Sequence, residues 1–387
     1  MQRDVTQRHK LAFVIGSIAA FTVVSGAAQA TTITVDRTGA PVSGHCNLTD
    51  AVQAATTNTG VHGCAAGSSR NTDTIVLAPN TTYQGYGKTL HIPPGGGALV
   101  IQGTLSNNAI STVIMSANYG YPNPAGGTSA CSDPAAIFVG GTLTVKNVIL
   151  QASETGTAGI CQYDGSLTLN GTDIGDSLLN NGFNARGILS YPNASNNHRA
   201  MTLQDTQIYG NYSPNIGAGI GLFGNVDFTM TNSGVQHNNA DESGGGIAWV
   251  GGWGKMGNMN ISVSDILYNQ TGVDSENAWG GGLYLAGDDV NASVVLTGTQ
   301  FQQNDSDTQT GGAIYIGSGM GTNKLVLADC FFLGNNAPAD SQQSTLNSDA
   351  WVYDVVYCQQ GTSMGNMSGS EWSGHSPPLK GDGTCTF

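Results

Sequence analysis

The sequence predicts an all-β chain that folds as a right-handed parallel β-helix, a solenoid with disulfide-tied terminal caps. Three features carry this prediction: a repeated alternating strand pattern, an asparagine that closes each repeat of that pattern, and a glycine-rich corner that follows the asparagine. The chain has 387 residues, with 56 Gly and only 10% charged residues. This composition suits turns and short strands better than long helices.

The strand pattern recurs in the segments 201–211, 228–238, 294–304 and 325–335. Each has an alternating apolar strand, a small residue, an apolar residue, two variable positions and Asn; segment 261–269 fits with a deletion. The closing residues are Asn211, Asn238, Asn269, Asn304 and Asn335, spaced 27, 31, 35 and 31 residues apart. One such unit cannot bury its apolar face alone, whereas stacked copies share a continuous core.

Alternation at period two assigns one apolar residue of each repeat to a shared interior column. The column is expected to contain Leu203, Met230, Val263, Leu296 and Leu327. Asparagines at one corner of successive coils can form a hydrogen-bonded ladder and tolerate a left-handed backbone. A β-propeller is the structural alternative, but its blades need about 40–45 residues and antiparallel hairpins, for which the signals are missing.

The second landmark is a glycine-rich corner. It reads GAGIGLFG (217–224), GGGIAWVG (244–251), GGGLYLAG (280–287) and GGAIYIGSG (311–319), with degenerate copies back to about residue 136. Glycine permits a sharp bend where a Cβ would clash. Because the corner recurs, its glycines need no ligand to explain them. The tryptophans near it do not recur in every coil and are left unexplained by the repeat.

Residues 1–30 have the pattern of a signal peptide. Arg3, Arg8 and Lys10 precede an apolar run that leads into AAQA, which predicts export and cleavage after Ala30. The alternative is an uncleaved anchor, but the run is shorter than the roughly 20 residues that span a bilayer. The remaining chain divides into an N-terminal cap with the first coils (31–100), the β-helix repeats (101–340) and a C-terminal cap or tail (341–387).

All seven cysteines follow the predicted leader, and an exported chain can form disulfides. Local pairing suggests Cys46 with Cys64, Cys131 with Cys161, and Cys358 with Cys385. Cys330 is left over, and its position inside a repeat suits a small buried residue. The connectivity does not follow from the sequence alone.

The charge of the exported part is strongly negative. Nine basic and 25 acidic residues follow residue 30, and after residue 200 only Lys255, Lys324 and Lys380 oppose 17 acids. Nucleic acid and anionic membrane surfaces are poor partners for such a field. No later segment is long and apolar enough to cross a bilayer, so we expect a secreted or cell-surface protein, in a Gram-negative cell at the periplasm or outer surface.

Two families resemble this chain. The pairing of motifs such as FQQN (301–304) and GGAI (311–314) resembles the repeats of the chlamydial polymorphic outer-membrane proteins. The segment 46–83, with Cys46, Cys64 and DTIVL (73–77), is similar to the CSLREA cap of secreted bacterial β-helix proteins, although Thr49 and Asp50 replace the usual Arg-Glu. The resemblance covers roughly residues 33 to 340 and implies a right-handed β-helix outside the cell, without implying a reaction.

The leading functional hypothesis is a non-catalytic, adhesin-like binding protein, secreted or on the cell surface. Its partner would be a glycan or another cell-surface molecule, with Trp249, Trp253 and Trp279 as candidate ligand-binding residues, since they lie near the glycine corners and could form a platform for sugar rings. A structural envelope component is a further alternative, in which the tryptophans only pack. The sequence predicts no oligomeric state.

The rival hypothesis is a carbohydrate-active enzyme, a polysaccharide hydrolase or lyase. A hydrolase needs two carboxylates about 5–5.5 Å or 6.5–9.5 Å apart. Equivalent loops on successive coils offer Asp241 with Glu242, Asp274 with Glu276, and Asp305 with Asp307. A lyase needs a base and calcium-binding carboxylates, but Lys255 is the only central cation after residue 200.

No cofactor is predicted. The acidic loops could bind Ca²⁺, but no D-x-D-x-D-G loop is present, and the seven histidines lack metal-ligand spacing, so no metal ligand is assigned. The sequence therefore leaves the choice between binding and catalysis open.

Overall fold

The computed structural model describes residues 30–84, 90–107, 109–110, 112–115, 135–151, 158–175, 186–192, 197–251, 257–272, 278–287, 292–306, 311–317 and 324–336. It also describes four short strands at 356–358, 364–368, 371–372 and 379–381, for which only the backbone is considered. Residues 1–29 of the predicted leader lie outside the described residues.

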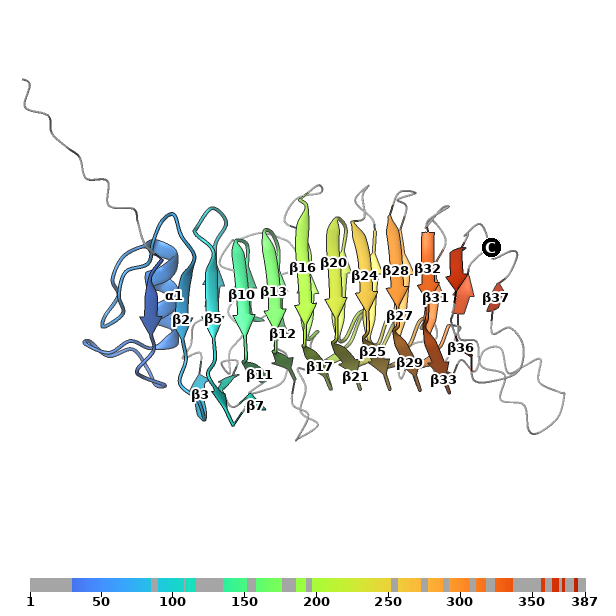
Figure 1. Ribbon diagram of the computed structural model, residues 1–387, viewed down its shortest axis with the longest axis horizontal. Coiled ribbons are helices and arrows are strands. Elements are labelled where there is room, and N and C mark those ends of the chain that lie inside the picture. Colours follow the sequence, from blue (N-terminus) through green and yellow to red (C-terminus); the bar gives the residue numbers. More distant parts are fainter. Residues whose placement is uncertain are drawn as a thin grey trace, which may run out of the picture.

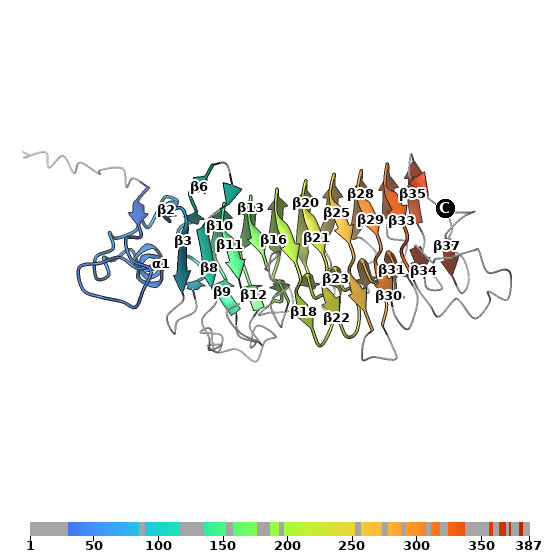
Figure 2. The same ribbon diagram turned by 90° about the horizontal axis from the view of Figure 1, so that it is seen from below.

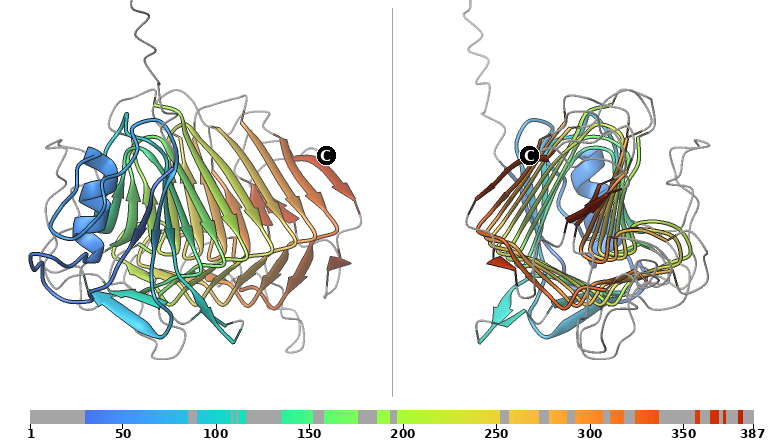
Figure 3. Two further views of the ribbon diagram at one scale, coloured as in Figure 1. Left: turned by 60° about the vertical axis from the view of Figure 1, so that its left-hand side comes forward. Right: turned by 90° about the vertical axis from the view of Figure 1, so that its right-hand side faces the viewer.

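The chain forms a right-handed parallel β-helix, as predicted. Three long sheets run side by side along its axis, and every strand within them pairs in parallel with strands of neighbouring coils (Figure 1, Figure 2). Seen from the C-terminal end, the coils wind counterclockwise as they approach the viewer, which makes the helix right-handed (Figure 3). This is the hand expected when a crossover connects parallel strands.

The first sheet has 11 strands. They are β1 (Thr32–Thr34), β2 (Asp73–Val76), β5 (Leu99–Gln102), β10 (Thr142–Lys146), β13 (Ser166–Asn170), β16 (Arg199–Gln204), β20 (Val226–Thr231), β24 (Asn258–Ser262), β28 (Ser293–Thr297), β32 (Lys324–Ala328) and β35 (Met364–Ser368).

The second and third sheets have 10 strands each. The second contains β3 (Thr81–Gln84), β8 (Thr112–Met115), β11 (Ile149–Gln151), β14 (Asp173–Ile174), β17 (Gln207–Tyr209), β21 (Gly234–Gln236), β25 (Asp265–Leu267), β29 (Gln300–Gln302), β33 (Phe331–Leu333) and β36 (Glu371–Trp372). The third contains β4 (Leu90–Ile92), β9 (Ala135–Val139), β12 (Ala158–Gln162), β15 (Ile188–Ser190), β19 (Ile220–Phe223), β23 (Ile247–Val250), β27 (Leu283–Ala286), β31 (Ile314–Ile316), β34 (Val356–Cys358) and β37 (Leu379–Gly381).

Smaller elements complete the described chain. A four-stranded sheet at the corner between the second and third sheets contains β18 (Tyr212–Ser213), β22 (Asn239–Ala240), β26 (Gln270–Thr271) and β30 (Asp305–Ser306). Strands β6 (Leu105–Ser106) and β7 (Ala109–Ile110) form an antiparallel hairpin, and α1 (Leu48–Thr57) lies at the N-terminal end of the coils (Figure 1). No helix among the described residues has the length and apolar character needed to span a membrane.

The core is a set of side-chain columns inside the coils. Leu203, Met230, Leu296 and Leu327 share one column and are fully buried, as predicted. The prediction for Val263 was wrong: Ile261 occupies that place, paired with Met230 and Leu296.

Val263 instead lies in the turn after β24, with φ +47° and 65% of its surface exposed. The cause is the deletion in segment 261–269, whose strand begins at Asn258, three residues earlier than the pattern suggested. A shift of this kind moves a residue out of the strand and away from the core.

The predicted asparagine ladder is present and fully hydrogen-bonded between coils. The side-chain amide of Asn238 donates to Oδ1 of Asn269 at 3.0 Å, and that of Asn269 donates to Oδ1 of Asn304 at 3.0 Å. Each amide also donates to a backbone carbonyl inside the coils, as Asn269 does to Val235 O at 2.9 Å. Buried polar groups are tolerated when every donor and acceptor is paired, so the ladder fixes the corner of each coil.

The glycine corner has a structural cause. The first glycine of each copy adopts a left-handed backbone, with φ +64° at Gly244 and +68° at Gly280. At the second position, a Cβ on Gly281 would lie 2.4 Å from the carbonyl oxygen of Asp305 in the next coil. Side chains are therefore excluded by the turn and by the close approach of the next coil.

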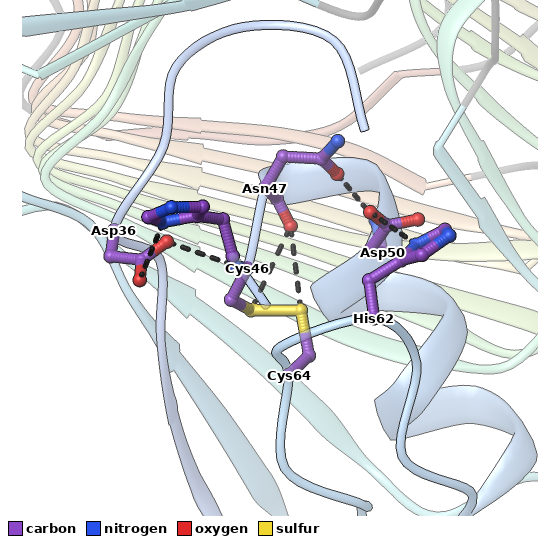
Figure 4. The surroundings of a disulfide bond; sticks show 7 residues. Asp36, Cys46, Asn47, Asp50, His62 and Cys64 are labelled. Carbon is purple, nitrogen blue, oxygen red and sulfur yellow. Dashed lines mark hydrogen bonds and ion pairs between the residues drawn. A yellow bond between two sulfur atoms is a disulfide. The ribbon is translucent and has the colours of Figure 1, made fainter. Parts of the chain in front are cut away.

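A disulfide-tied cap covers the N-terminal end of the coils. Asn47 caps the start of helix α1, and its side chain accepts a hydrogen bond from the backbone of Asp50 at 2.8 Å. The predicted bond between Cys46 and Cys64 is confirmed, and His62 contacts the fully buried carboxylate of Asp50 at 2.9 Å (Figure 4). The helix start, the turn after the helix and the first coil are thus held together.

We expect the double substitution Cys46→Ser, Cys64→Ser to lower the free energy of unfolding by about 3 kcal/mol, because the bond closes a loop of 18 residues. Denaturant unfolding followed by circular dichroism measures this loss. The single variant Cys330→Ser, which leaves the disulfide intact, serves as the comparison for a cysteine replacement. An unchanged midpoint in the double variant would contradict a stabilising role of the cap disulfide.

Candidate ligand-binding surface

Three aromatic rings gather on the outer face of the third sheet. The ring centres of Trp279 and Tyr315 lie 5.6 Å apart, those of Tyr284 and Tyr315 5.5 Å apart, and those of Trp279 and Tyr284 6.4 Å apart. The planes differ by only 15–27°. We refer to these three residues as the aromatic cluster.

The aromatic cluster is held in place by two strands and one corner. Tyr284 in β27 and Tyr315 in β31 are partners in the parallel register, one position after the inward Leu283 and Ile314, so alternation turns both rings outward. Trp279 lies in the corner that precedes β27.

The backbone of this corner is held by the loop of the preceding coil. The N–H of Trp279 donates to Oγ of Ser243 at 3.2 Å, and its carbonyl accepts from the N–H of Gly244 at 3.0 Å. Trp279 and Tyr284 are half-buried, whereas Tyr315 is buried beside them with 6% exposure. The part of the cluster that solvent reaches is therefore formed mainly by Trp279 and Tyr284.

An acidic group lies within electrostatic reach of the cluster. Burial, and then the negative charge of Glu242, raise the pKa of Tyr284, so its hydroxyl remains protonated at neutral pH and can donate a hydrogen bond. Glu242 is exposed, and its backbone N–H donates to Asn215 O. The surface thus combines aromatic area with a hydroxyl donor and a carboxylate acceptor.

The neighbouring Asp241 is engaged within the protein. Its Oδ2 accepts a hydrogen bond from the hydroxyl of Tyr212 at 2.5 Å. Asp305, which the sequence places in the corresponding loop, lies instead in β30, paired with Gln270 of β26. Gln270 in turn pairs with Asn239 of β22, so Asp305 aligns with Asn239, two residues before Asp241. Asp241 and Asp305 therefore do not form one row of carboxylates.

The structure corrects the role of Trp249. Its side chain is fully buried in the core, in register with Leu222 and Leu285 inside the coils. Because Ile247 points inward, alternation along β23 turns Trp249 inward as well. No ligand on the surface can reach this ring, so Trp249 is a core residue rather than a ligand-binding one.

Several other predicted residues lie outside the described residues: Trp253, Asp274, Glu276 and Asp307, and also Cys131 and Cys385. Cys358 is described only as a backbone position of β34. Cys161 takes part in a disulfide. Cys330 is buried, with its thiol 3.4 Å from Leu296 O, which suits the small buried residue that the sequence predicted.

Tyr284 and Tyr315 were not identified from the sequence. A signal was available, because GGGLYL and GGAIYI place a tyrosine at the same position after the corner in two successive repeats. Within the described residues, no group of three or more His, Cys, Asp and Glu side chains is arranged to hold a metal ion.

Comparisons with known proteins show neither a family nor an activity for this chain. No protein-family model and no curated protein matches the chain. Among solved structures, the chain is similar to the crystal structure of the pectate lyase Pel9A, with 14% identity and a TM-score of 0.43, covering 79% of this chain and 70% of that chain. A likeness at this level does not indicate a shared activity.

Proposed function

We propose that the chain is an exported, non-catalytic binding protein, adhesin-like in function, that takes an uncharged glycan on the aromatic cluster. The observation that carries this proposal is the gathering of Trp279, Tyr284 and Tyr315, from two successive coils, into near-parallel rings on the outside of the helix. Ligand sites combine aromatic area with a few polar groups that orient the ligand. The hydroxyl of Tyr284 and the carboxylate of Glu242 are the polar groups available here.

The charge of the protein supports an uncharged ligand. Its formal net charge is −14, and Glu242 adds a negative charge at the cluster itself. A polyuronate or another polyanion would be repelled by this field. A neutral sugar instead offers C–H faces to the rings and hydroxyl groups to the carboxylate.

The enzymatic alternative rests on paired carboxylates. Hydrolysis of a glycosidic bond needs one group as acid and a second as base or nucleophile. Asp241 and Glu242 are the two candidates that lie within the described residues, and Asp241 already accepts a hydrogen bond from Tyr212. This engagement favours binding over catalysis at this position.

The proposal is tested by measuring binding and digestion together, on an array of neutral and acidic glycans. We expect Trp279→Ala to weaken binding of the best neutral glycan about tenfold or more. Tyr268→Ala provides a matched control, because Tyr268 is an exposed aromatic residue outside the cluster (39% exposed). The Tyr268→Ala variant should bind this glycan with the affinity of the unmodified protein.

Three outcomes would contradict the proposal. Equal affinities of Trp279→Ala and Tyr268→Ala would remove the cluster from the site. Released oligosaccharide that disappears in Glu242→Gln would show that the protein is an enzyme. Binding restricted to acidic glycans would contradict the choice of ligand.

A further inference from the structure

Arg199 is a fully buried cation inside the coils. It is the first residue of β16, its side chain points inward in register with Val226, and it has no solvent exposure. Arginine is almost never buried to this extent unless its charge is paired. Its position inside an otherwise apolar solenoid therefore needs an explanation.

The hydrogen bonds of Arg199 are incomplete. Nη2 donates to the backbone carbonyl of Phe223 at the end of β19. Nε and Nη1 find no acceptor among the described residues, although both atoms are buried. A guanidinium has five N–H donors and no acceptor, so most donors of Arg199 have no hydrogen-bond partner among the described residues.

Among the described residues, no carboxylate forms an ion pair with Arg199. The ion pairs in the described part of the chain join histidines to aspartates, at Asp36, Asp50 and Asp227. Asp164 acts on Arg199 from a greater distance, and its Oδ1 accepts the N–H of Gly165. Burial lowers the pKa of Arg199 and the charge of Asp164 partly offsets this effect; the resulting pKa is about 10, so the group remains a cation at neutral pH.

A second unpaired donor lies at the same end of the third sheet. The indole N–H of Trp249 is buried and has no acceptor among the described residues. Trp249 pairs in register with Leu222, the residue before Phe223, whose carbonyl Arg199 binds. The side-chain amide of Gln162 donates to the carbonyl of Ala200, next to Arg199, at 2.9 Å, and its Oε1 already accepts from the hydroxyl of Ser190 at 3.0 Å. This part of the interior therefore has an excess of donors.

We propose that a small inorganic anion of the chloride class is bound inside the coils beside Arg199, where it accepts hydrogen bonds from the guanidinium. A buried charge without a partner is strongly destabilising, whereas an anion in contact with it supplies both the missing charge and the missing acceptor. A water molecule would supply an acceptor but no charge. The inference is independent of the glycan-binding proposal, since it concerns the interior.

The first test measures thermal stability at constant ionic strength while gluconate is replaced by chloride. A tenfold excess of chloride over its Kd is expected to raise the Tm of the unmodified protein by about 2 °C. Arg199→Met, which replaces the cation by an apolar side chain of similar length, is expected to abolish this rise. Arg186→Met is the control, because Arg186 is a half-buried arginine that bonds to Ile216 O at 2.7 Å, and it should keep the full rise.

The second test locates the anion. Crystals grown in bromide should give an anomalous peak in contact with the guanidinium of Arg199. The proposal is overturned if that position holds density without anomalous signal, since the occupant is then water. It is also overturned if the Tm of the unmodified protein does not respond to chloride, or responds equally in Arg199→Met.

Discussion

Replacing Asn269 by alanine is expected to lower the free energy of unfolding by about 3 kcal/mol or more, among the largest effects of any polar substitution in this chain. Asn269 is fully buried at the centre of the ladder. Its Oδ1 accepts from the backbone and side chain of Asn238, and its amide donates to Val235 O and Asn304 Oδ1. Alanine would leave these buried partners without hydrogen bonds, and each unsatisfied group costs about 1–3 kcal/mol.

Denaturant unfolding measures this effect, and Asn258→Ala is the matched control. Asn258 is an exposed asparagine on the first sheet whose side chain reaches Asp227 at 3.3 Å. Its replacement should change the free energy of unfolding by no more than about 0.5 kcal/mol. If the two alanine variants were equally stable, the ladder would not be an important source of stability.

Replacing Trp249 by alanine is expected to cost about 3–5 kcal/mol, because it removes a large side chain from the middle of a packed column and leaves a cavity. The side chain has no solvent exposure and lies between Leu222 and Leu285. Thermal or denaturant unfolding gives the magnitude.

The variant Trp279→Ala is expected to behave differently from Trp249→Ala. Trp279 is half-buried on the outer surface, so its loss should change glycan binding while the unfolding midpoint stays close to that of the unmodified protein. The opposite pattern, a stable Trp249→Ala and an unstable Trp279→Ala, would contradict the assignment of Trp249 to the core and of Trp279 to the surface.

These two tryptophans also show how far the sequence could predict the site. The repeat was identifiable because the same apolar positions, asparagine and glycines return in each coil, and a stacked solenoid enforces that periodicity. Which face of a strand a residue occupies depends on register, and one displaced position reverses it. The recurring isoleucine of GGGIAWVG is inward, so the tryptophan two residues later had to be inward as well.

Other features could not be predicted because they depend on contacts between coils. The aromatic cluster requires Trp279 of one corner to meet tyrosines of two different strands. The unpaired donors of Arg199 become evident only when its burial and its partners are known. The wrong prediction for Val263 has a simpler cause. A short deletion moved the start of the strand, and no pattern within segment 261–269 indicates where that strand begins.

The unequal spacing of the ladder asparagines has a consequence for how such a protein can vary. The intervals of 27, 31, 35 and 31 residues differ by as many as eight, yet β16, β20, β24, β28 and β32 remain in register. The additional residues are accommodated in connections between strands, where lengthening a loop costs little free energy. Outer loops can therefore gain or lose residues independently of one another, which would let the surface diversify over evolutionary time while the interior columns are inherited unchanged.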